Sequence, residues 1–158
     1  MTLGEIRRAL AGFPRPDGYA LRVIPLRYRG DKPHLSAWTN FDDHTITIQI
    51  PTPFLPFGEI VPYAAQRRPG KAMRFIWLTE GVTFRTPREA LRFLYLHEWM
   101  HWYLKERHNA KSQAETTCDR FALRNYRKAT VTIGDARDAM KRRRTSSNGV
   151  NGNNGRAR

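Results

Sequence analysis

The chain has 158 residues, which is about one domain of ordinary size, and 40% of them are hydrophobic. Its 28 Lys and Arg against 14 Asp and Glu give a formal net charge of +14, which favours polyanionic partners such as nucleic acid, an acidic protein surface or anionic lipid. The single cysteine, Cys118, excludes an intrachain disulfide and a Cys-rich zinc finger. Without a signal-peptide pattern or an apolar run of about 18 residues, we expect a soluble, cytoplasmic protein with no membrane span.

The N-terminal part of the chain predicts one short helix followed by strands. Apolar residues in 2–11 have the spacing of one helix face. Residues 19–28 predict a strand, and Pro25 within it indicates an edge strand or a bulge. Residues 29–40 predict a loop. In residues 44–50, isoleucines alternate with Thr and Gln, which predicts a half-buried strand of an antiparallel sheet.

The next segment is rich in proline. Residues 51–70 contain five prolines together with aromatic side chains, which predicts an ordered loop packed on the body of the protein. Residues 71–79 predict another strand, with Met73, Phe75 and Trp77 on one side.

A helical pattern starts at Thr86. This residue is suited to be the N-cap, Pro87 to be the first helical residue, and Glu89 lies three positions after the cap. Apolar residues occur nearly all round the helix as far as about Lys105, so we expect it to be central and buried.

Two more helices are predicted after it. One starts at Asn109 or Ser112 and continues to about residue 128, and a weaker one covers residues 133–140. The last eighteen residues contain six Lys and Arg among Asn, Gly and Ser. We therefore expect a domain over residues 1–140 and a disordered basic tail over 141–158.

The central helix carries the run His97-Glu98-Trp99-Met100-His101. Its two histidines lie one turn apart on the same face, so both imidazoles can reach one ion, and zinc suits such a pair. Glu98 is about 100° further round the helix and can act as general base on a zinc-bound water. The alternative is an ordinary core helix, but buried histidines and a carboxylate would each need a polar partner there.

A catalytic zinc site needs a third protein ligand. Glu115 and Asp119 share one face of the following helix, with Glu115 favoured as ligand and Asp119 as a hydrogen-bond acceptor for a histidine N–H. Ser112 and Glu115 also match a capping box, in which case Glu115 would cap its own helix and Asp119 could be the ligand. His108, just past the helix end, is a third candidate.

The run from His97 to His101, followed by the segment 114–122, resembles the small gluzincin-type metallopeptidases, including the ImmA/IrrE-like group and related minimal zincins. The resemblance implies Zn²⁺ bound by His97, His101 and Glu115, with Glu98 as base. It also implies a small sheet whose edge strand binds an extended peptide, a part that the strand at 44–50 or at 71–79 could take. Tyr103 and Tyr126 are candidates for a group that stabilises the transition state.

Together these features predict an α+β, minimal zincin-like domain, in which a small, mostly antiparallel sheet packs on the helix with the two histidines and on the following helix. The predicted function is a zinc metallopeptidase that hydrolyses peptide bonds of a protein or peptide substrate. The alternatives are a regulatory or DNA-associated binding protein with a structural zinc site, and a hydrolase of non-peptide amides. The basic tail could also contact nucleic acid non-specifically.

Overall fold

The computed structural model describes residues 1–28, 32–68, 74–111 and 114–141. In chain order the elements are α1 (Leu3–Ala9), β1 (Ala20–Leu26), β2 (Ser36–Asn40), β3 (Thr45–Pro51), β4 (Phe57–Arg68), β5 (Arg74–Phe84), α2 (Pro87–Trp102), a π-helical turn (Tyr103–Arg107), α3 (Glu115–Asn125) and α4 (Ile133–Met140). The predicted α+β class is confirmed. The predicted tail, apart from Lys141, lies outside the described residues.

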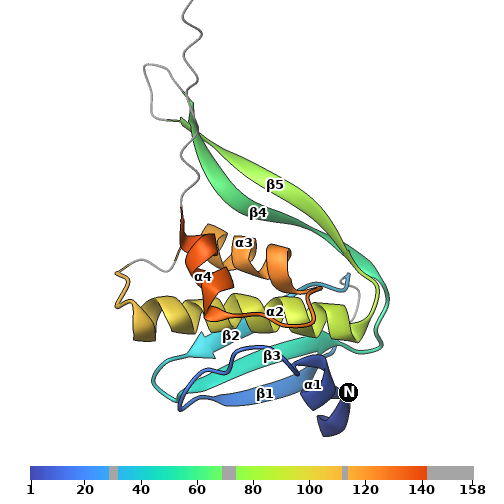
Figure 1. Cartoon of the computed structure of the whole chain (residues 1–158). Coiled ribbons are helices and arrows are strands. Elements are labelled where there is room, and N and C mark those ends of the chain that lie inside the picture. Colours follow the sequence, from blue (N-terminus) through green and yellow to red (C-terminus); the bar gives the residue numbers. More distant parts are fainter. Residues whose placement is uncertain (29–31, 69–73, 112–113, 142–158) are drawn as a thin grey trace, which may run out of the picture.

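Helix α2 occupies the centre of the fold (Figure 1). A three-stranded sheet covers one side of it, α3 and α4 cover the other, and the long hairpin of β4 and β5 arches over α3. The strand order is β1-β3-β2, with β1 parallel and β2 antiparallel to β3, while β4 and β5 form a separate antiparallel pair. The expected single sheet is therefore two sheets, and the larger one is mixed. The described helices include none long and apolar enough to cross a membrane.

Strand β2 lies where the sequence predicted a loop. A tight turn returns it to β3: the side chain of Asn40 accepts the backbone N–H groups of Asp42 and Asp43 at 3.0 and 3.1 Å. His44 completes the turn with a φ of 51°. Asn side chains stabilise turns in this way. The pairing of β2 comes from this turn and from β3, whereas its own five residues show no regular alternation, so the strand was not evident in the sequence.

Strand β4 occupies most of the stretch that was predicted to be a proline-rich loop. The pairing register with β5 shifts between Pro62 and Ala64. Proline has no N–H for the strand ladder, so a bulge at this point accommodates it. The expected packing on the body is confirmed, since Phe57 is buried and the ring of Phe54 lies 5.9 Å from it.

The start of α2 follows its sequence signals. The hydroxyl of Thr86 accepts the backbone N–H of Glu89 at 3.2 Å, and Pro87 is the first helical residue. Leu91 and Met100, at opposite ends of the helix, are both fully buried. The prediction of a central, buried helix is therefore confirmed. The fold places a polar motif inside the core, where each polar group needs a partner from another element.

The two faces of β5 predict a contrast in stability. Phe84 is fully buried among the rings of Phe57, Phe93 and Tyr126, whereas Phe75 on the same strand is 58% exposed. Phe84→Ala should lower the free energy of unfolding by about 3–5 kcal/mol. Phe75→Ala should change it by no more than about 0.5 kcal/mol. Urea denaturation of both variants measures this, and equal losses would contradict the assignment of the two faces.

Candidate metal centre

Helix α2 directs two imidazoles to one point. His97 and His101 lie one turn apart, and their Nε2 atoms are 3.1 Å from each other. Their side chains are only 14% and 10% exposed. Two unprotonated imidazole nitrogens at this separation repel through their lone pairs unless a proton or a cation lies between them, so the pair is suited to share one positive ion.

Helix α3 supplies a carboxylate to the same point. Glu115 Oε2 lies 3.2 Å from His97 Nε2, and Oε1 lies 3.4 Å from His101 Nε2. Glu115 is the first residue of α3, after an N-cap at Ala114 that makes no side-chain cap hydrogen bond. It is therefore not at the N3 position of a capping box, and the capping alternative for Glu115 is wrong. Its side chain, 70% exposed, forms the solvent side of the group.

The separations of these atoms fit a tetrahedral ion. Zinc binds imidazole nitrogen and carboxylate oxygen at about 2.0–2.2 Å, and the ligand atoms of such a tetrahedron lie roughly 3.3–3.6 Å apart. The observed separations of 3.1, 3.2 and 3.4 Å are close to this range. His97, His101 and Glu115 could thus hold a metal ion.

Asp119 stands behind this group, one turn further along α3. Its Oδ1 lies 2.8 Å from Nδ1 of His97, the ring nitrogen that faces away from His101. Burial alone would lower the pKa of His97, but the contacts to Asp119 and Glu115 outweigh it and raise the pKa to about 9. With this pKa the ring carries a proton on both nitrogens at neutral pH, so a metal ion would have to displace the proton on Nε2, while Asp119 would keep the proton on Nδ1. The contact is compatible with the supporting role predicted for Asp119, which stays a prediction.

Glu98 is held from the other side of α2, by β2. The hydroxyl of Thr39 donates to Glu98 Oε2 at 2.8 Å, and the glutamate is only 5% exposed. Burial raises the pKa of Glu98, and its neighbours His97 and Thr39 offset part of the rise. Thr39 was not predicted as a site residue. Because the sequence predicts a loop at β2, it gives no signal that this threonine contacts Glu98.

The other candidates lie away from the group. His108 is exposed and its ring lies 4.8 Å from that of Tyr103. Tyr103 is itself stacked on Trp99 in the core, and Tyr126 is buried among core aromatic rings. Cys118 is fully buried. Neither tyrosine is therefore placed to act on a substrate bound beside His97.

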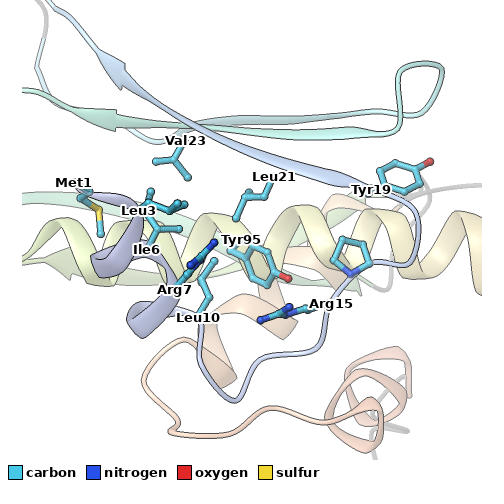
Figure 2. A pocket seen from close by; sticks show the side chains of 11 residues that line it. Met1, Leu3, Ile6, Arg7, Leu10, Arg15, Tyr19, Leu21, Val23 and Tyr95 are labelled. Carbon is cyan, nitrogen blue, oxygen red and sulfur yellow. The ribbon is translucent and has the colours of Figure 1, made fainter.

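A separate hollow of about 560 Å³ lies on the other face of α2 (Figure 2). Apolar side chains of α1 and β1, among them Ile6 and Leu21, face one another across it, and Tyr95 lines it from α2. Tyr95 is roughly 200° round the helix from His97. A molecule in this hollow would therefore not reach the metal group.

Comparisons of the chain with protein-family models, with curated proteins and with solved structures find no match. What the structure defines is an α+β protein with a His-His-Glu group that could hold a metal ion. The resemblance to gluzincin-type peptidases stays a prediction.

The group predicts a stoichiometric metal site. Protein dialysed against zinc should retain about one ion per chain, and His101→Ala should remove it because only two donors remain. His108→Ala, which changes an exposed histidine outside the group, should retain the ion. Elemental analysis by plasma mass spectrometry measures both variants. Equal zinc contents in the two variants would contradict the assignment of the site.

The contact between Asp119 and His97 predicts a smaller loss of zinc binding than that expected for His101→Ala. Asp119→Ala should weaken zinc binding by about 10- to 100-fold, because the His97 ring loses the partner that fixes its orientation and tautomer. Competition with a chromophoric chelator measures the change. Asp138→Ala, which changes an exposed residue of α4, is the matched control and should bind zinc as the unaltered protein does.

Proposed function

We propose that this protein is a zinc-dependent peptidase of the minimal zincin type, acting on a protein or peptide substrate. The observation that supports this most directly is the convergence of His97, His101 and Glu115 from two helices, with Glu98 beside them on the same helix as the histidines. Each of these residues has the chemical character that peptide hydrolysis at a metal requires.

The donor set favours zinc as the ion. Two imidazoles and one carboxylate form one of the standard three-residue sets of catalytic zinc sites. When bound, zinc polarises the scissile carbonyl and lowers the pKa of the attacking water. The protein contributes the geometry, because Asp119 orients one imidazole and the α2 backbone sets the spacing of both.

Glu98 is the proposed general base. Its carboxylate is buried, which raises its pKa towards the range in which a carboxylate both accepts and returns a proton. It takes the proton of the attacking water and then donates it to the leaving amine. The hydrogen bond from Thr39 restricts the rotation of the carboxylate, so that Oε1 is the oxygen free to take up the proton.

The exposure of Glu115 supports catalysis over a purely structural metal. Structural zinc sites have four protein ligands and are closed. Here the described residues provide three ligands, and the carboxylate that completes the group is 70% exposed. A fourth position that faces solvent would be open to water and to a substrate.

Strand β2 is the proposed support for an extended peptide. The strand at 44–50, one of the two strands expected to bind a peptide, is β3. It pairs with both β1 and β2, so it has no free edge and that expectation is wrong. In the described sheet β2 is an edge, and its Thr39 contacts Glu98. A peptide that adds to β2 would lie beside the general base.

A second candidate function is a regulatory, DNA-associated binding protein that uses the metal for structure only. The formal net charge of +14 favours it. For either function we propose a cytoplasmic location, since a single cysteine is typical of proteins that do not depend on disulfides.

Substitution of Glu98 distinguishes a peptidase from a binding protein with a structural metal. Glu98→Gln should keep zinc but lower the rate of hydrolysis by about 10²- to 10⁴-fold, because the amide cannot take up the proton of the water. Zinc-loaded protein is added to a cell extract, and the new N-termini that it generates are identified by mass spectrometry. Synthetic peptides that span these cleavage sites then give the rates.

The matched control is Glu80→Gln, which alters an exposed carboxylate on β5 and should leave the rates unchanged. If Glu98→Gln retains zinc and generates the same N-termini at the same rates, the peptidase proposal fails and the binding function gains support.

A further inference from the structure

The outer face of the β4–β5 hairpin exposes large apolar side chains. Phe75 and Trp77 are each 58% exposed, and Ile60 on β4 is 74% exposed. Alternate residues of a strand point to the same face, so Phe75 and Trp77 lie together, on the face opposite to that of the buried Val82 and Phe84. Near Val82 and Phe84 the inner face thus packs on the core, and further along the strand the outer face leaves two aromatic rings in contact with water.

Exposed aromatic rings gathered on one face indicate an interaction surface. Each ring presents a large apolar area to solvent, at a free-energy cost that burial against a partner would remove. In Figure 1 the hairpin rises beyond α3 and α4, so the helices leave this end of the ribbon uncovered. A partner could therefore reach the rings without any rearrangement of the fold.

The charge of the same half of the hairpin points to a polyanion. Between Val61 and Thr79 the sequence contains four Lys and Arg and neither Asp nor Glu. The strand register sets Arg67 opposite Phe75, and Arg68 opposite Arg74. Cationic residues and the two aromatic residues therefore occur within the same few residue pairs of the ribbon, the combination by which proteins bind single-stranded nucleic acid.

We propose that the outer face of this hairpin binds single-stranded nucleic acid, with bases stacked on Phe75 and Trp77 and phosphates attracted by the positive charge of this half of the ribbon. Two strand positions span roughly 6.6 Å, about twice the ~3.4 Å between stacked bases, so the two rings can take separate bases. A duplex offers only its groove edges and its backbone, and its paired bases have no free faces for stacking.

This proposal is independent of the metal centre. The rings lie on the outer face of the hairpin, whereas Glu115 and Asp119 belong to α3, which packs under its inner face. Zinc-stripped protein and the His101→Ala variant should therefore bind nucleic acid as the zinc-loaded protein does. A failure of the peptidase proposal would leave this binding unaffected.

Fluorescence anisotropy with a labelled oligothymidylate of roughly 16 nucleotides tests it. Phe75→Ala and Trp77→Ala, made in the full chain, should each weaken binding by about 5- to 150-fold, the loss expected for one stacked base. Trp38→Ala, which removes an exposed tryptophan from β2, is the matched control and should bind normally. Circular dichroism checks that each variant is folded.

Salt titrations distinguish stacking from charge. Trp77→Ala should leave the slope of log K against log salt concentration unchanged, whereas Arg67→Ser should reduce its magnitude by about 0.7, the value for one phosphate contact in a single strand. A chain that ends at Lys141 should remain sensitive to Trp77→Ala, since the rings and not the tail carry the stacking.

Three results would overturn the proposal. One is an equal affinity of Trp77→Ala and Trp38→Ala for the oligonucleotide. Another is an affinity for the matched duplex as high as for the single strand, which would indicate charge alone. The third concerns polyglutamate at equal charge concentration. If polyglutamate displaces the oligonucleotide, and Trp77→Ala lowers the affinity for polyglutamate but not for the oligonucleotide, the partner would be an acidic protein instead.

Discussion

The packing of α3 against α2 is the contact on which the candidate metal centre depends. Trp99 of α2 lies against Phe121 of α3, with ring centroids 5.5 Å apart and both side chains fully buried. This apolar contact fixes the distance and the register of the two helices, and so it sets Glu115 and Asp119 opposite His97. Burial of these polar side chains carries a desolvation cost. The surrounding core stabilises an arrangement that the polar residues alone would not adopt.

The polar residues of α2 show how such an arrangement remains compatible with a buried helix. Three of them have a partner on another element: Glu98 binds Thr39 of β2, His97 contacts Asp119 of α3, and Arg92 donates to the carbonyl oxygen of Lys128 beyond α3. Buried polar groups require partners of this kind, and their partners in turn restrict where the sheet and α3 can lie. The central helix thus specifies its neighbours through polar contacts as well as through packing.

The parts of the fold that were predicted correctly are those with local causes. Helical spacing placed His97 and His101 on one face, the Thr86 cap and Pro87 located the start of α2, and residues 133–140 coincide with α4. The failures have non-local causes. Strand β2 depends on its pairing with β3, and β4 forms despite Pro62 because a bulge absorbs the proline. Thr39 could not be assigned to the site before β2 was known.

Within the described residues the hairpin packs on the helices near Val82 and Phe84, whereas Phe75, Trp77 and Leu78 toward its other end are exposed. The guanidinium of Arg120 on α3 donates to the carbonyl oxygen of Tyr63 at 2.6 Å and to that of Ala139 at 2.9 Å, which joins the bulged part of β4 to α3 and α4. Beyond this clamp the strands run on past the helices, and nothing in the described core requires aromatic residues there. Soluble proteins usually blunt such a ribbon with charged or small residues. The exposure of Phe75 and Trp77 is a feature that packing of the described core does not account for, and it is the observation on which the proposed interaction rests.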